Sequence, residues 1–62
     1  MEIFEATMMA EGASGYEAES LEEYLEAYQL LIDTGTVWKL QGFFGRTATD
    51  LIDQGLCTRE GK

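Results

Sequence analysis

Between Thr36 and Gly55, apolar residues recur every three or four positions, which is the period of an amphipathic α-helix. Thr36 has a hydroxyl group suited to capping the first turn, and Gly55 suits the left-handed backbone that often follows the last turn. The spacing therefore predicts a helix over about 36–54 with one apolar face. The residues of this face are Val37, Leu40, Phe44, Ala48, Leu51 and Ile52.

Two glycines, Gly42 and Gly45, lie inside this predicted helix. Each costs about 1 kcal/mol relative to alanine in a helix interior. We favour a continuous helix, and the alternative is a break at Gly42–Gly45 that gives two short helices. On a continuous helix the glycines belong to a second stripe of mostly small side chains, along which another backbone can approach closely. This stripe, predicted to form a dimer interface, consists of Trp38, Gly42, Gly45 and Thr49.

The segment before Thr36 carries the clearest local signal for a helix. Ser20-Leu21-Glu22-Glu23 has the pattern of a capping box, in which the serine bonds forward and the last glutamate reaches back. Gly35 is expected to end this helix, so the predicted range is about 20–34. Its apolar face is predicted to consist of Leu21, Tyr24, Leu25, Tyr28, Leu31 and Ile32.

Only the short loop Thr34–Thr36 separates the two predicted helices, and helices joined in this way commonly pack antiparallel. The fold class is therefore predicted to be all-α, with an antiparallel helical hairpin of about 20–34 and 36–54. One hairpin cannot bury all of the aromatic side chains, so we expect two copies to pair into a four-helix bundle homodimer. The remaining residues are predicted to be a flexible N-terminal arm over 1–19 and a C-terminal tail over 57–62, around a hairpin domain over 20–56.

The arm has a second interpretation. Gly12, Gly15 and small or acidic residues favour a flexible connector, but Phe4, Met8 and Tyr16 are suited to anchoring an arm that binds a partner.

A chain of 62 residues forms one domain at most, and such a small domain usually needs a disulfide, a metal or a partner chain for stability. One cysteine cannot form an internal disulfide, and the absence of histidine disfavours a structural zinc site. We therefore expect no metal or cofactor, and stabilisation by self-association or a partner. No basic segment with an apolar core opens the chain and no apolar run approaches 18 residues, so neither a signal peptide nor a membrane span is expected.

The net charge of −8 is distributed unevenly. The first 33 residues contain nine acids and no base, whereas the rest contain three acids and all four bases. This uneven charge distribution disfavours direct binding to nucleic acid or an anionic membrane, and it favours a partner with a basic surface. The residues expected to bind a partner are Glu19, Glu22, Glu23 and Glu26 through their charge, with Trp38, Phe43 and Arg46 as anchors, since Trp and Arg are enriched at interface hot spots.

The sequence gives no support for catalysis. It has no histidine, and no serine or cysteine stands beside a plausible base. A small helical hairpin also offers no deep pocket in which the pKa of a carboxylate would shift. We therefore expect the protein not to be an enzyme.

Most of the chain resembles a family of small, mostly uncharacterised proteins encoded by tailed bacteriophages. The resemblance rests on an acidic helix ending in Ile-Asp-Thr-Gly, followed by the pattern Trp-x-Leu-Gln-Gly-x-x-Gly-Arg-Thr-Ala from Trp38 to Ala48. It implies a viral origin and a location in the host cytoplasm, but no activity. The expected function is that of an interaction protein that binds and modulates a host protein, as an inhibitor of host defence or a mimic of DNA.

The end of the chain, ATDLIDQGLCTREGK, also resembles the end of the recognition helix and the first wing strand of MarR-like winged-helix repressors. The alternative function is therefore a structural or regulatory module, or a truncated winged-helix-like transcription factor. The acidic composition opposes DNA reading by such a module.

Overall fold

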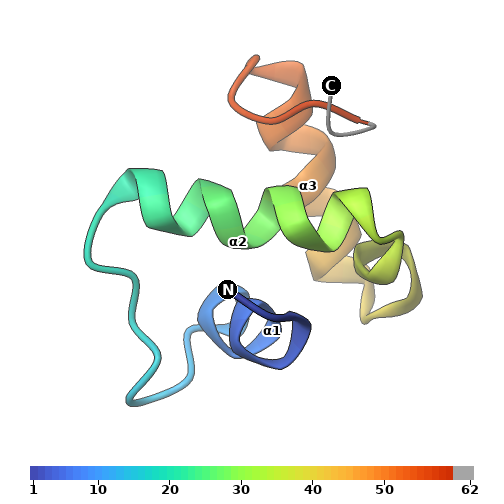
Figure 1. Ribbon diagram of the computed structural model, residues 1–62. Helices are drawn as coiled ribbons and strands as arrows, with labels where there is room; N and C mark the ends of the chain where they lie inside the picture. Colours follow the sequence, from blue (N-terminus) through green and yellow to red (C-terminus); the bar gives the residue numbers. More distant parts are fainter. Residues whose placement is uncertain (60–62) are drawn as a thin grey trace.

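The computed structural model describes residues 1–59, and within this range the chain is all-α. Three α-helices and one short 3-10 helix follow one another along the chain (Figure 1). None of these helices combines the length and the apolar character that crossing a membrane requires. The elements are α1 (Ile3–Glu11), α2 (Leu21–Asp33), η1 (Thr36–Lys39) and α3 (Gly42–Asp53).

Helix α1 lies within the segment predicted to be a flexible arm, so that prediction is corrected for Ile3–Glu11. The Glu2 carboxylate caps the helix by accepting from the backbone N–H groups of Phe4 and Glu5, at 2.9 and 3.2 Å. Gly12 ends it in the left-handed conformation. The helix is ordered because one face is apolar and packs against α2. The buried residues of that face are Ala6, Met9 and Ala10.

Helix α2 begins where the capping box predicts. The Ser20 hydroxyl accepts from the backbone N–H of Glu23 at 3.1 Å, and the Glu23 carboxylate accepts in return from the N–H of Glu19 at 2.8 Å. The predicted apolar face is confirmed towards the end of the helix, where Tyr28, Leu31 and Ile32 are buried, and Ala27, which the prediction did not include, is buried with them. The predicted apolar face is wrong at the start of α2, since Leu21 is 63% exposed.

The continuous helix predicted over 36–54 is wrong. Residues Thr36–Lys39 form the 3-10 helix, Leu40 and Gln41 are extended, and α3 starts only at Gly42. A continuous helix would separate Trp38 from Gly45 by about 10 Å along its axis. The break instead lets the Trp38 ring lie against Gly45. The predicted apolar face survives the break, because Val37, Phe44, Ala48 and Leu51 are buried and Leu40 and Ile52 are half-buried.

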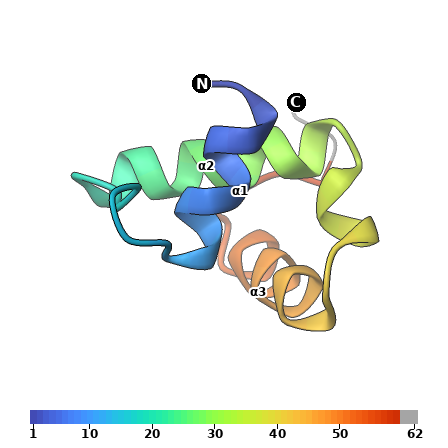
Figure 2. The same ribbon diagram turned by 90° about the horizontal axis from the view of Figure 1, so that it is seen from below.

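The helices do not form the predicted antiparallel hairpin. In the view of Figure 1, α1 lies beneath α2 and α3 passes behind it, and Figure 2 confirms that the three helices run in different directions. Helix α2 contacts α1, and η1 contacts both α2 and α3. The extended residues Leu40 and Gln41 redirect the chain, so α3 crosses α2 instead of running back along it. The structure therefore does not contain the hairpin from which the predicted four-helix bundle would be built.

Part of the predicted C-terminal tail is attached to α2. Gly55 adopts the left-handed conformation that ends α3. The Gln29 side-chain amide then forms two hydrogen bonds with the backbone of Thr58: its Nε2 donates to the carbonyl at 2.8 Å, and its Oε1 accepts from the N–H at 2.9 Å. Cys57 is buried beside this pair, with its Sγ 3.8 Å from the Leu25 carbonyl oxygen. Residues 60–62 of the predicted tail lie outside the described residues.

The sequence-level resemblance to a wing strand has no counterpart in the part of the chain that the structure describes. Residues 55–59 form turns and bends, and residues 1–59 contain no β-strand.

The hydroxyl group of Tyr28 belongs to a side chain that is only 1% exposed. Burial raises the pKa of this phenol from 10.0 to about 12, and the neighbouring Tyr24 adds to the shift. A hydrogen bond with the Thr47 side chain acts in the opposite direction. The core therefore holds Tyr28 in its neutral form.

Replacing Gln29 with alanine should loosen the C-terminal segment, because both bonds to Thr58 are lost at a cost of about 1–2 kcal/mol. Such a cost corresponds to a factor of roughly 5–30 in the population of the open form. We expect alkylation of Cys57 by iodoacetamide to accelerate by about that factor. Gln54→Ala, at an exposed glutamine just after α3, is the matched control. Equal alkylation rates for the two variants would show that the Gln29 pair does not hold the segment.

The Tyr28 shift also predicts a loss of stability at high pH. Between about pH 10 and 12 the folded phenol keeps its proton while the unfolded one loses it, so the free energy of unfolding falls as the pH rises. The loss should reach about 2 kcal/mol by pH 12. Urea unfolding at about pH 9 and 12 should show it in the wild type and in Tyr16→Phe, at a tyrosine outside the core cluster. Tyr28→Phe should show a smaller loss, to which the raised pKa of the buried Cys57 thiol still contributes, and an equal loss in all three proteins would contradict the assignment.

Candidate interaction surfaces

An open hollow of about 650 Å³ lies between η1 and residues 42–50 of α3. Two aromatic side chains flank it, Trp38 at 44% exposure and Phe43 at 38%. Apolar surface predominates in the hollow, and one cation and one carboxylate complete it. The lining residues are Trp38, Gly42, Phe43, Gly45, Arg46, Thr47, Thr49 and Asp50.

The hollow exists because of the break in the chain and the glycine on the other side of it. The extended residues Leu40 and Gln41 fold Trp38 back over α3. A Cβ atom placed on Gly45 would lie 3.7 Å from Cε3 of the Trp38 ring, so the ring lies against backbone. The glycine stripe thus brings two parts of the same chain close together.

The hollow brings together the residues of the predicted dimer stripe and the three anchors predicted in the second half of the chain. Trp38, Phe43 and Arg46 line one hollow with Gly42, Gly45 and Thr49. The stripe was predicted on a single straight helix, whereas Trp38 belongs to the separate helix η1. The position of η1 next to α3, and not helical spacing, therefore brings these residues together.

A second arginine reaches this site from the end of the described chain. The guanidinium carbon of Arg59 lies 5.8 Å from the centre of the Trp38 ring, within the range of a cation–π interaction. This contact was not predicted from the sequence. Arg59 and Trp38 are 21 positions apart and on different elements, and no periodicity links them. Only the return of the chain after α3 brings them together.

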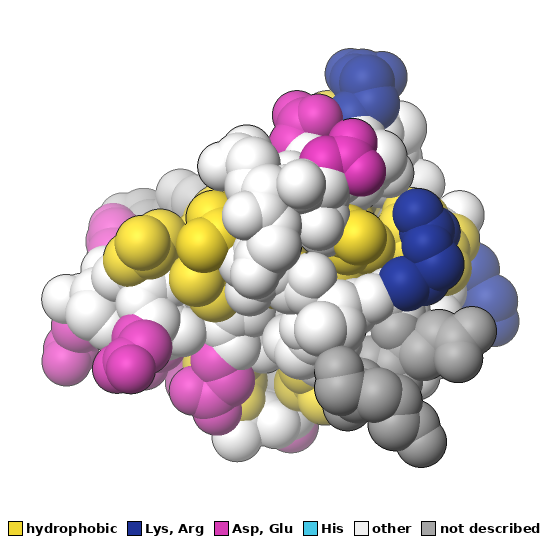
Figure 3. Space-filling view, turned by 90° about the horizontal axis from the view of Figure 1, so that it is seen from above, with side chains coloured by type: hydrophobic (Ala, Val, Ile, Leu, Met, Phe, Trp, Pro, Cys, Tyr) yellow, Lys and Arg dark blue, Asp and Glu magenta, His cyan; other side chains and the backbone are white. Residues whose placement is uncertain are grey.

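The acidic residues predicted to bind a partner form a separate surface at the first turns of α2. Glu19, Glu22 and Glu26 are exposed, while Glu23 is half-buried and caps the helix. Figure 1 places the start of α2 at the opposite side of the molecule from η1 and α3. In Figure 3, Asp and Glu side chains gather at the left and lower edge of the view and also lie at the top beside a basic side chain, whereas the other Lys and Arg side chains lie at the right. The structure thus keeps the acidic surface and the aromatic hollow apart.

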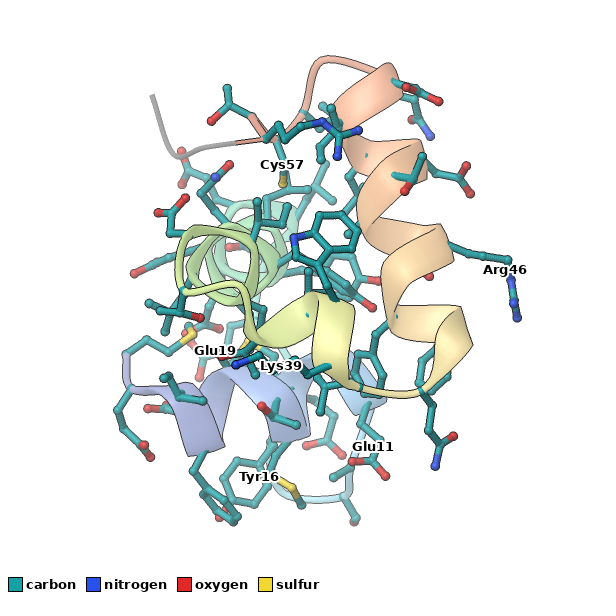
Figure 4. All side chains as sticks on the ribbon, turned by 90° about the vertical axis from the view of Figure 1, so that its right-hand side faces the viewer. Glu11, Tyr16, Glu19, Lys39, Arg46 and Cys57 are labelled. Atoms are coloured by element: carbon teal, nitrogen blue, oxygen red, sulfur yellow. The ribbon has the colours of Figure 1, made fainter. Side chains whose placement is uncertain are left out.

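Arg46 extends away from the body of the molecule (Figure 4). Its Nη1 atom would lie 3.3 Å from a Cβ atom added to Gly42, so the guanidinium stays over the first turn of α3. Among residues 1–59, no carboxylate oxygen lies within 4.0 Å of an Arg46 nitrogen. The guanidinium is therefore available to an incoming anionic group at the rim of the hollow.

The alternative anchors on the N-terminal segment do come together in part. Phe4 is 57% exposed, and its ring meets that of Tyr16 edge to face, with centroids 6.0 Å apart. Met8 is half-buried on the same helix. This aromatic pair ties the loop after α1 back to the helix and leaves most of the Phe4 surface open.

Comparison with known proteins identifies the family of this chain. Residues 6–62 match the family described as domain of unknown function DUF7417. The chain belongs to this family. Its description assigns no activity, and the match includes α2, η1, α3 and most of α1. No curated protein matches the chain, and no solved structure does.

The contact between Trp38 and Gly45 predicts opposite effects for two substitutions. Gly45→Ala places its methyl group in ordinary contact with the ring and removes a helix-interior glycine, so it should raise the free energy of unfolding by up to about 1 kcal/mol. Gly45→Leu should displace the ring and shift the fluorescence of the only tryptophan to longer wavelength. Urea unfolding followed by this fluorescence measures both effects. A destabilised alanine variant, or a leucine variant with unchanged emission, would contradict the packing.

Proposed function

We propose that this protein binds another protein through the acidic surface at the start of α2 and modulates it by covering part of its surface. The observation that carries the proposal is the charge distribution: nine acids and no base in residues 1–33, with Glu19, Glu22 and Glu26 exposed around one helix end. No basic side chain of this half is present to neutralise them. Such a surface attracts a basic partner and increases its association rate.

The phage origin implied by the sequence resemblance makes a host protein the proposed partner, with the host cytoplasm as the place of encounter. A row of carboxylates on a small rigid body resembles the charge of a nucleic-acid backbone. Host enzymes that bind DNA carry basic surfaces for that purpose. We therefore propose that the protein is an inhibitor that occupies such a surface, without chemistry of its own.

The proposal is tested by affinity capture from a bacterial host lysate, with salt-dependent elution and identification by mass spectrometry. Partners retained by the wild type at about 0.1 M salt should elute as the salt rises, because exposed charges are then screened. If the protein mimics DNA, a double-stranded DNA fragment should also release them at low salt. An interaction indifferent to salt would instead favour a structural module held by apolar contacts.

Charge reversal identifies the surface. Glu22→Lys with Glu26→Lys should abolish capture. Glu11→Lys with Asp53→Lys is the matched control, since it makes the same change in net charge at exposed sites on α1 and α3. The control should retain the partner. If the α2 variant also retains it, the acidic surface is not the binding site.

A further inference from the structure

Exposed apolar side chains are concentrated at the start of the chain. Three of the seven large hydrophobic side chains that are exposed within residues 1–59 belong to its first four residues, Met1, Ile3 and Phe4. Helical spacing places Phe4 on the face of α1 opposite the buried Ala6 and Met9, which pack against α2. The core therefore does not use the ring of Phe4.

The outer face of α1 carries a small apolar surface. Met8 follows Phe4 by one helical turn and is half-buried, and the Tyr16 ring returns from the loop to meet the Phe4 ring edge to face. We call Phe4, Met8 and Tyr16 the α1 surface. Figure 2 shows α1 in front of α2, and no other element of residues 1–59 lies over its outer side. An apolar surface that its own chain leaves uncovered is typical of a binding site for another molecule.

The charged side chains of α1 and of the loop that follows it are all acidic. Glu11 continues the row of Phe4 and Met8 along the helix, Glu5 lies on the flank of this row, and Glu17 follows the tyrosine of the loop. Figure 4 shows Tyr16 beneath α1 and Lys39 above it, on the side of η1. The α1 surface thus has an apolar centre and an acidic rim, which complement a segment whose apolar side chains are flanked by lysine or arginine.

We propose that the α1 surface is the docking site for a basic amphipathic helix of the partner protein. Such a helix carries apolar side chains at spacings of three and four, so two successive ones cover Phe4 and Met8, which are about 6 Å apart along α1. Lysine or arginine side chains next to them face Glu5 and Glu11. The flexible thioether of Met8 adapts to apolar side chains of different shape.

This inference deepens the proposed function and rests on it for the basic character of the partner. Tyr16 precedes Ser20, the cap of α2, by four positions, so their Cα atoms lie at most about 14 Å apart. A partner that contacts the acidic start of α2 is therefore within reach of the α1 surface. Charge then accelerates the encounter, and burial of apolar area at Phe4 slows dissociation.

The test uses two synthetic peptides with the same leucine and lysine composition, one with the leucines at helical spacing and one in scrambled order. Isothermal titration calorimetry at about 0.15 M salt measures the affinity of each for the full chain. The amphipathic peptide should bind at least about tenfold more tightly, because only its helix places leucines on Phe4 and lysines on the acidic rim together. Attraction by net charge alone predicts equal affinities, since the two peptides carry the same charge.

Substitutions locate the site. Phe4→Ser should weaken binding of the amphipathic peptide by at least about tenfold, whereas Phe4→Leu keeps an apolar side chain and should stay within about threefold of the wild type. Leu56→Ser is the matched control, because it removes an exposed apolar side chain after α3 and should leave the affinity unchanged.

Nuclear magnetic resonance tests the same contact without a substitution, so the result does not depend on the folding of a variant. The methyl signal of Met8 should shift when the amphipathic peptide is added to the wild type. The methyl signal of Met9, which is buried against α2, should shift less.

Several outcomes would overturn the docking. They are equal affinities for the two peptides, undiminished binding by Phe4→Ser, and an unmoved Met8 signal. Retention of the wild type but not of Phe4→Ser on phosphatidylcholine vesicles would assign the surface to a lipid instead. A wild-type dimer in sedimentation equilibrium that Phe4→Ser dissociates would assign it to a second copy of the chain.

Failure of this inference is distinguishable from failure of the proposed function. In the lysate capture, a partner that Phe4→Ser retains in full but that Glu22→Lys with Glu26→Lys loses would support the acidic surface and reject docking at α1. The α2 variant leaves the α1 surface intact, so it should still bind the amphipathic peptide more tightly than the scrambled one.

Discussion

The fold depends on the burial of α2 by segments from both ends of the chain. Helix α1 covers part of it from the N-terminal side, and η1 and the segment after α3 cover it from the C-terminal side. Ala27 and Leu31 are fully buried as a result. Neither α1 nor η1 is long enough to persist in isolation, because short helices in water are marginal without tertiary packing. The central helix therefore gives order to elements that their own sequences do not stabilise.

The second constraint is the course of the chain between η1 and α3. Two extended residues replace what would have been a single straight helix, and they place an indole ring over a glycine. This arrangement leaves Trp38 and Phe43 partly exposed and creates the hollow between them. The return of the chain after α3 then adds Arg59 to the ring. The Trp38 ring thus joins two parts of the second half that are distant in the sequence.

Local signals in the sequence were sufficient for some of these features. The capping box at Ser20 and the left-handed glycines at Gly35 and Gly55 act through neighbouring residues, so the ends of α2 and α3 could be predicted. The apolar spacing identified the residues that are buried in the second half, even though the helix is interrupted. Helix α1 was missed because its buried face consists of alanine and methionine. The hydrophobicity of these residues differs little from that of the half-buried residues around them, so the helical pattern is weak.

The sequence by itself determined the all-α class, the limits of α2 and the separation of charge between the two halves, because these follow from caps, periodicity and composition. Only the tertiary structure decided that the second helix breaks before Gly42, that α3 crosses α2, and that Leu21 faces outward. It also decided that Arg59 meets Trp38. These features depend on contacts between residues distant in the chain, where the gain from packing Trp38 on Gly45 competes with helix propensity, and no local pattern records the outcome.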